Sequence, residues 1–497
     1  MAREILNGIV SWVFIHPWFV MSVIAFLVVT LAIWLPRISI PYLRRCFDVV
    51  MQERILKVLL PTILSVVLLL PYYLSFHRGY ADDAEAIYAR AGSQIAEHGL
   101  NANLSEYFRW VANPPFASFL LAAGYKLFGA SPTVSRFVTF LFPLLFSLFL
   151  YFYLRRREGI FGAFVPVLLV IVNPIFIIYS KYVGSDAPFL AFSSTSLLII
   201  LYADSLKGKR LILSSILLGI SLATKYLALF LFPVAFIYSL VKTGIFSEFS
   251  KTGLFSVIRF NLWYFALALL VSVPFLAIGF MSVAGVRTPI YGFMFVPDEW
   301  LGLAPNFSGF IPRIFAYLMY LGLFVGPFFL VLVPDLWRRI GKMRFFLLLG
   351  GLAVLTFVVH LFFPISSLHT YGGTVGEMNL LGLEGYFSPT HLDVGLFLAL
   401  LVAEILIVSL ALDLRHNGDN KIVYLFYWIL IPILLMPLLR DAQRYLLIVI
   451  VPLSLYMAFV AKRMYAERMK PFVIGVLGLH VMFYLYWGVL LLGKVIY

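Results

Sequence analysis

The stretch VSRFVTFLFPLLFSLFLYFYL, from Val134 to Leu154, runs directly into the basic triplet Arg155–Arg157. The stretch is almost wholly apolar and long enough to cross a bilayer as a helix, which takes about 20 residues. Basic residues that follow such a run are typical of the cytoplasmic end of a membrane helix. The whole chain has the same character, because 63% of its residues are hydrophobic and 12% are charged, whereas about a quarter of a soluble domain is charged. The sequence therefore predicts an integral membrane protein.

Apolar runs of this kind recur from end to end, and their lengths predict an all-α polytopic membrane protein with about fourteen transmembrane helices. The predicted helix cores are Trp18–Leu35, Val58–Phe76, Val134–Leu154, Phe161–Ser180, Ala187–Tyr202, Leu211–Ala223, Tyr226–Leu240, Phe260–Phe280, Ile314–Leu332, Phe345–Phe363, Leu392–Leu412, Ile422–Leu438, Tyr445–Ala461 and Phe472–Leu492. The pair within Leu211–Leu240 has two interpretations. It forms two short helices that meet near Thr224 and Lys225, or one re-entrant hairpin.

Basic residues gather in alternate loops between these runs, for example at Arg155–Arg157, Lys207–Arg210, Arg338–Arg344 and Lys462–Lys470. The positive-inside rule makes these loops cytoplasmic and puts both termini outside. The net charge of +14 is thus spread over many loops, and nucleic acid is not an expected partner. We expect a multi-pass protein of the cell membrane, in contact with membrane lipids.

The same topology predicts three parts of the chain. Residues 1–57 form an extra N-terminal transmembrane helix with a cytoplasmic loop, residues 58–461 form the main transmembrane region, and residues 462–497 form a C-terminal transmembrane helix. The main region carries three long external loops, at 77–133, 281–313 and 364–391.

The first external loop contains the signals of two interfacial helices. Asp83–His98 places Ile87, Tyr88, Ala91 and Ile95 at helical spacing, which gives one apolar stripe. Asn113-Pro114-Pro115 precedes the apolar run Phe116–Phe128, and Gly129 follows it. A cap residue with proline before a helix and glycine after it mark the two ends of a helix.

Asp82 and Asp83 lie where the second predicted membrane helix is followed by the first interfacial helix. A carboxylate there meets water on one side and lipid-borne substrates on the other. Transfer of a sugar to a hydroxyl requires a base that accepts the proton of the nucleophile, and a carboxylate suits this role. The alternative is helix capping, which one Asp would already satisfy. We therefore predict that at least one of the two is catalytic.

Four stretches resemble motifs of the GT-C superfamily of membrane glycosyltransferases, in the branch that holds protein O-mannosyltransferases and the lipid A aminoarabinose transferase (glycosyltransferase family 39-like). The stretches are Gly79–Ala89 with the acidic motif, Asn113–Ser131 followed by Arg136, Lys181–Ala187 together with Gly219–Lys225, and Arg440–Leu446. They cover roughly residues 58–461 in the order and on the side of the membrane that the topology predicts.

This resemblance implies an inverting glycosyltransferase that takes a monosaccharide from a polyprenyl (dolichyl) phosphate carrier. Its acceptor hydroxyl, on a lipid, a glycan or a protein, lies on the extracytoplasmic face. An Asp of the acidic motif, Asp82 or Asp83 here, supplies the base, and basic residues near the Pro-Pro helix and the late Arg-rich turn hold the lipid phosphate. Family members often have Lys or His before the two prolines, where this chain has Asn113. Arg109 is the candidate to replace that basic residue.

The predicted substrate-binding residues are Glu85, Arg109, Asn113, Lys181, Asp186, Lys225, Arg440 and Arg444. Four of them have a second interpretation. Lys225 either faces a partner or wet cavity, or snorkels to the outer interface. Arg440 and Arg444 share one helical face and bind a lipid phosphate, or pair with Asp441 or a lipid headgroup. Asp186 either contributes to the site or caps its helix, and Glu404 is expected to be a buried, hydrogen-bonded carboxylate.

No cofactor is indicated with certainty. A divalent metal ion is a weaker alternative, because the loop that holds His369, Glu377, Glu384 and His391 lacks the short ligand spacing of a metal site. The main alternative function is a secondary transporter or a lipid-linked sugar flippase, and a non-catalytic membrane subunit is the second. Transporters commonly carry inverted repeats and polar groups at the bilayer midplane. Here no repeat is apparent and the acidic motif lies at the outer surface.

Overall fold

The computed structural model describes residues 62, 80, 83–111, 113–203, 205–206, 208–245, 250–281, 303–362, 389–417, 420–435, 446–466, 469 and 472–484. Within these ranges every regular element is an α-helix or a 3₁₀-helix, which confirms the predicted all-α architecture. By length and composition, 6 of the described helical segments can cross a membrane: Pro132–Ile171, Lys251–Ile278, Arg313–Ile340, Lys342–Leu361, Phe397–Arg415 and Leu447–Ala466. The number of about fourteen spans stays a prediction, because Trp18–Leu35 and all of Val58–Phe76 except Thr62 lie outside the described residues.

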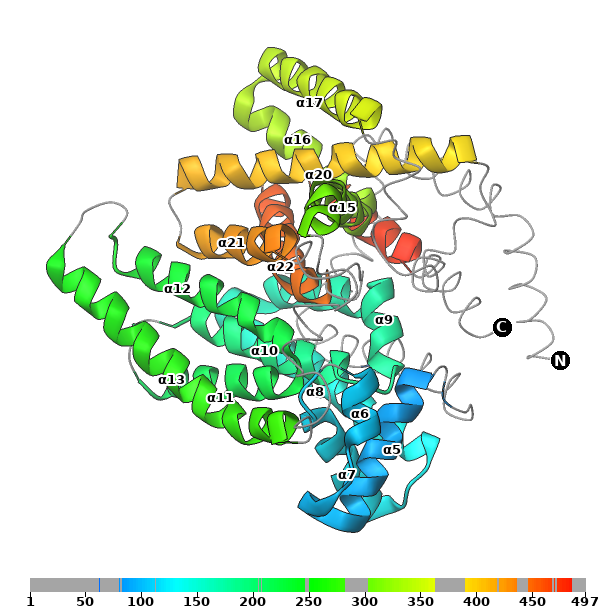
Figure 1. Cartoon of the computed structure of the whole chain (residues 1–497). Coiled ribbons are helices and arrows are strands. Elements are labelled where there is room, and N and C mark those ends of the chain that lie inside the picture. The colour runs from blue at the N-terminus through cyan, green and yellow to red at the C-terminus, as the bar shows by residue number, and fades with distance from the viewer. Residues whose placement is uncertain are drawn as a thin grey trace.

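Three short helices form a compact unit beside the start of the first long helix (Figure 1). They are α5 (Asp83–His98), α6 (Ser105–Trp110) and α7 (Phe116–Phe128). The predicted stripe is the buried face of α5, since Ile87, Tyr88, Ala91 and Ile95 are each at most 7% exposed. Gly129 ends α7 with a φ of 81°, a conformation that L side chains rarely adopt. Both helices predicted in the first external loop therefore have the predicted bounds.

The middle of the chain forms a bundle around buried α10. Its helices are α8 (Pro132–Ile171), α9 (Pro174–Lys181), α10 (Asp186–Leu201), α11 (Lys209–Thr224), α12 (Leu231–Lys242) and α13 (Lys251–Met281). The element α8 contains the predicted span Val134–Leu154 and turns sharply at Gly159. The predicted span Phe161–Ser180 is divided, because α8 ends at Ile171 and α9 begins at Pro174 after the N-cap Asn173. Between α11 and α12 the backbone leaves the helix at Lys225, and a 3₁₀ turn, Tyr226–Phe230, follows. The structure thus has two helices that meet at Thr224 and Lys225.

The last part of the chain packs against this bundle through α21 and α22. Its helices are α15 (Leu303–Val325), α16 (Phe329–Ile340), α17 (Lys342–Phe362), α20 (Pro389–Asn417), α21 (Asn420–Leu435), α22 (Leu447–Ala466) and the helix Phe472–Tyr484. The predicted external loop 281–313 is shorter than expected, because α13 extends to Met281 and α15 already begins at Leu303. Most of the loop 364–391 lies outside the described residues.

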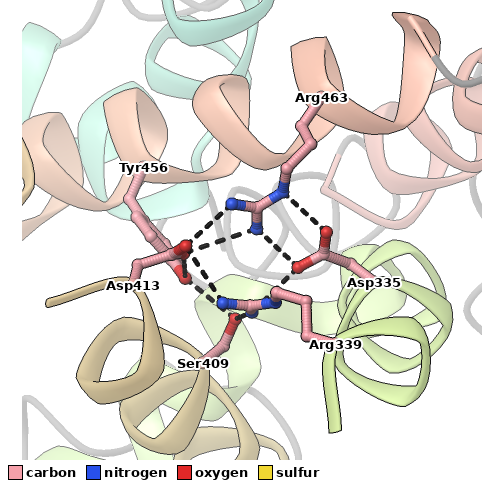
Figure 2. A network of polar contacts seen from close by, with 6 residues as sticks. All are labelled: Asp335, Arg339, Ser409, Asp413, Tyr456 and Arg463. Atoms are coloured by element: carbon pink, nitrogen blue, oxygen red, sulfur yellow. Dashed lines mark hydrogen bonds and ion pairs between the residues drawn. The ribbon is translucent and has the colours of Figure 1, made fainter. Parts of the chain in front are cut away.

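A network of charged side chains joins three of these helices (Figure 2). Arg463 of α22 donates to both oxygens of Asp335 on α16 and to Asp413 on α20, at 2.5–2.7 Å for the three shortest contacts. Arg339 lies between the same two carboxylates, 2.8 Å from Asp335 and 3.0 Å from Asp413. The Tyr456 hydroxyl donates to Asp413 at 2.7 Å. Each buried carboxylate thus faces two guanidinium groups, as burial of charge requires.

Candidate active site

The start of α5 is attached to the bundle through a fully buried carboxylate. Glu85 accepts two hydrogen bonds from the guanidinium group of Arg136 on α8, at 3.1 Å and 2.9 Å. It also accepts the backbone N–H of Val183 at 2.8 Å. Arg136 in turn donates to the carbonyl oxygen of Lys181 at 3.0 Å. Two side chains thereby fix α5, α8 and the segment between α9 and α10 against one another.

Lys225 and Asp186 form a second buried ion pair in the same region. The ammonium group of Lys225 contacts a carboxylate oxygen of Asp186, and both residues are at most 4% exposed. Asp186 is the first residue of α10, and Lys225 follows the last residue of α11. The ammonium group also lies 5.9 Å from the ring centre of Phe189. Lys225 therefore faces a partner inside the protein and does not snorkel to the surface.

Tyrosine hydroxyls link the interfacial helices to this segment. Tyr88 of α5 donates to the hydroxyl of Ser185 at 2.9 Å and accepts the side-chain amide of Asn113 at 3.3 Å. Tyr107 of α6 donates to the carbonyl oxygen of Pro114 at 3.1 Å. Burial, with Tyr88 as a neighbour, raises the pKa of the Tyr107 hydroxyl well above its ordinary value. Tyr107 consequently remains a neutral donor at physiological pH.

These contacts bring several predicted site residues into one region. Glu85, Asn113, Lys181, Asp186 and Lys225 all belong to the connected set of contacts around the start of α5. Asn113 does not cap α7, whose N-cap residue is Pro115 and lacks a side-chain cap. Asp82, Arg440 and Arg444 lie outside the described residues, as do the side chains of Asp83 and Arg109. Their predicted roles stay predictions.

Three contributors to this region, Arg136, Tyr88 and Ser185, lie in or beside the motif stretches but were not among the predicted site residues. Arg136 carried a usable signal, because it lies inside the predicted span Val134–Leu154, where an ionisable side chain needs a partner. Nothing local to Tyr88 or Ser185 distinguishes them from residues of an ordinary apolar stripe or turn.

In the described part of the chain, no group of three His, Cys, Asp or Glu side chains is arranged to hold a metal ion. Of the loop considered as a weaker candidate for a metal site, His369, Glu377 and Glu384 lie outside the described residues, as does the side chain of His391.

A family model described as dolichyl-phosphate-mannose-protein mannosyltransferase matches residues 112–278. The oligosaccharyltransferase of Archaeoglobus fulgidus, solved with Zn and sulfate, has a similar fold, with a TM-score of 0.50 and 13% identity over 89% of this chain and 53% of that chain. In sequence, residues 112–278 are therefore similar to a mannosyltransferase family of the GT-C class. This confirms the resemblance drawn from the four sequence motifs.

Two further solved structures resemble this chain. ArnT from Cupriavidus metallidurans, bound to undecaprenyl phosphate, has a TM-score of 0.41 and 18% identity over 87% of this chain and 77% of that chain. The archaeal oligosaccharyltransferase AglB from Archaeoglobus fulgidus, with an inhibitory peptide and a dolichol-phosphate, has a TM-score of 0.47 and 13% identity over 89% of this chain and 56% of that chain. No curated protein sequence matches the chain.

Proposed function

We propose that this protein is a GT-C glycosyltransferase that transfers a monosaccharide from a polyprenyl or dolichyl phosphate to an acceptor hydroxyl. The observation that carries the proposal is a chain of contacts that links four predicted site residues to α5. Asn113 is linked through Tyr88, the backbone of Lys181 through Arg136 and Glu85, and Asp186, with its partner Lys225, through the neighbouring Ser185. All four belong to the segment 112–278, which matches the mannosyltransferase family model. The name of that family points to a dolichyl-phosphate sugar as the donor class.

The proposed chemistry is a single inverting displacement. Asp82 or Asp83 accepts the proton of the acceptor hydroxyl while its oxygen attacks the anomeric carbon. The bond between that carbon and the phosphate oxygen breaks, and its electron pair leaves with the polyprenyl phosphate. A positioned general base contributes about 10²–10⁴-fold to the rate of such a step. The bond to phosphate supplies the driving force, and no step of this scheme uses a nucleotide or a metal ion.

Basic residues are the proposed contacts of the phosphate leaving group. Arg440 and Arg444, with Arg109, are the best candidates, because guanidinium groups bind phosphate oxygens in pairs. The described geometry gives Lys225 another role, since its ammonium group neutralises Asp186. We assign Lys225 and Glu85 to positioning: each pairs with a charge that anchors a segment of the site.

The proposed active site faces the extracytoplasmic side. It lies at the Asp186 end of α10, a helix of 16 residues and thus about 24 Å in length. Tyr202, at the other end of α10, contacts Lys421 and Arg157, two residues from predicted cytoplasmic loops. The positive-inside rule then puts the site near the outer surface.

The test is the substitution of each Asp by Asn, which keeps size and capping ability but removes the base. Purified protein is incubated with radiolabelled polyprenyl-phosphate sugars and membrane extract. We expect Asp82→Asn or Asp83→Asn to reduce turnover by about 10²–10⁴-fold with donor binding retained. Glu97→Gln is the matched control, because it removes an exposed carboxylate from the far end of the same helix. Wild-type turnover in both Asn variants would refute the assignment of the base and would favour a transporter or flippase.

A further inference from the structure

A groove runs between α11 and α13, away from the candidate active site. It has a volume of about 1150 Å³, and its walls are mainly apolar, with Leu211, Phe255, Trp263 and Leu267 among the side chains. The two helices touch at its floor, where the Ser215 hydroxyl donates to the carbonyl oxygen of Tyr264. Phe255 and Trp263 are 66% and 71% exposed. In a membrane, this groove is open to lipid acyl chains.

The polar end of the groove is basic. Lys251, the first residue of α13, and Arg259 both line it, and both side chains are exposed. They lie eight residues apart on α13, which is about 12 Å along the helix axis. The described lining includes no Asp or Glu. In the described part of the chain, neither cation has a carboxylate partner, so both are available to an anion.

The position of this end separates it from the candidate active site. α11 begins at Lys209, beside the groove, and ends next to Lys225, so the two sites lie at opposite ends of a helix of 16 residues. The segments that lead into α11 and α13 belong to the predicted cytoplasmic loops. An anionic surface potential attracts basic residues to the cytoplasmic leaflet, and a tryptophan such as Trp263 is typical of the membrane interface.

We propose that this groove binds one anionic glycerophospholipid of the cytoplasmic leaflet. Lys251 and Arg259 contact the phosphate group, which accepts charge-assisted hydrogen bonds. An acyl chain lies along Phe255 and Trp263 and fills the groove above the contact between Ser215 and Tyr264. Charge complementarity selects the lipid headgroup, and the apolar walls require a tail.

The test is lipid retention by the full-length protein in detergent, measured by native mass spectrometry. Delipidated protein is titrated with dioleoyl phosphatidylglycerol or dioleoyl phosphatidylcholine. We expect one phosphatidylglycerol to bind saturably and at least tenfold more tightly than phosphatidylcholine. Lys251→Gln/Arg259→Gln should abolish that preference. The matched control is Lys342→Gln/Arg344→Gln, which removes two exposed cations from α17, outside the groove, and should keep it.

Three results would overturn the proposal. They are equal binding of the two lipids, equal loss of preference in the groove and control variants, and full displacement of the lipid by inorganic phosphate, which lacks a tail. Size-exclusion profiles identify any variant that fails to fold, and the single substitution Arg259→Gln then replaces the double one. Because the readout is lipid binding, the result is independent of whether the chain transfers sugars.

Discussion

At the scale of single residues, Glu85 shows how a buried charge holds a site together. Its side chain is fully buried and receives hydrogen bonds from Arg136 and from the backbone of Val183. Without such partners, a buried carboxylate would lose its hydrogen bonds to water and gain none from the protein. The contacts of Glu85 with Arg136 and with the segment before α10 therefore fix the position of the start of α5, which includes Asp83.

Removal of one member of this pair should be costly. We expect Glu85→Gln to lower the free energy of unfolding by about 3–5 kcal/mol, because it leaves the Arg136 charge buried and uncompensated. Glu85→Gln/Arg136→Met should recover part of that loss, but not all, since the carbonyl oxygen of Lys181 also loses a donor. Thermal melts in detergent measure both variants. A single variant as stable as the wild type would contradict the structural role.

The pair of Lys225 and Asp186 allows the two roles of Lys225 to be distinguished. If positioning is its role, Lys225→Gln and Asp186→Asn should lower the melting temperature and turnover together. The double variant should recover stability, because it leaves no unpaired buried charge. Donor KM and thermal stability are measured for all three. A rise in donor KM for Lys225→Gln alone, with normal stability, would instead support a direct contact with the donor phosphate.

At the scale of elements, the sequence predicts a helix best where its ends and its buried face are both local properties. α5 has its predicted bounds because an apolar stripe marks its buried face, and α7 because Pro114-Pro115 precedes it and Gly129 directly follows it. The break of α8 at Gly159 also falls where the sequence predicts it, between the spans Val134–Leu154 and Phe161–Ser180, but the contacts of that break were not predictable. Glu158, beside that break, is neutralised by Lys421 and Lys462, and no window of sequence contains partners so distant. The pairs of Glu85 with Arg136 and of Asp186 with Lys225 could not be predicted either, because their members also lie far apart in the sequence.

Helix contacts in the second half of the bundle depend on glycine. A Cβ on Gly322 of α15 would overlap the carbonyl oxygen of Ala399 on α20, and a backbone carbonyl cannot move aside easily. We expect Gly322→Ala to destabilise the protein by about 1–3 kcal/mol, as overpacking typically does. Gly350→Ala on α17 is the control, because open space surrounds that position and alanine favours a helix. Thermal melts that rank the two variants equally would contradict this packing.

At the scale of the whole molecule, several ion pairs gather at the end of the bundle that the topology predicts to be cytoplasmic. The network of Asp335, Arg339, Asp413 and Arg463 (Figure 2) draws its members from segments next to predicted cytoplasmic loops. Glu158, Lys421 and Lys462 extend the same pattern to α8 and α21. The sequence predicts on which side these cations lie, because the rule depends on loop composition alone. Which carboxylate each cation meets depends on the packing of helices far apart in the chain.

This distribution leads to a test of orientation. We expect a cysteine at Asn101, between α5 and α6, to react with a membrane-impermeant maleimide in intact cells. A cysteine at Arg156, beside the Glu158 cluster, should react only after the membrane is made permeable. Both positions are exposed, and both variants carry Cys46→Ser so that no other thiol is present. Equal labelling after permeabilisation is the control for reactivity. The reverse pattern in intact cells would put the start of α5, and the proposed base with it, on the cytoplasmic side, and sugar transfer at the outer face would then be ruled out.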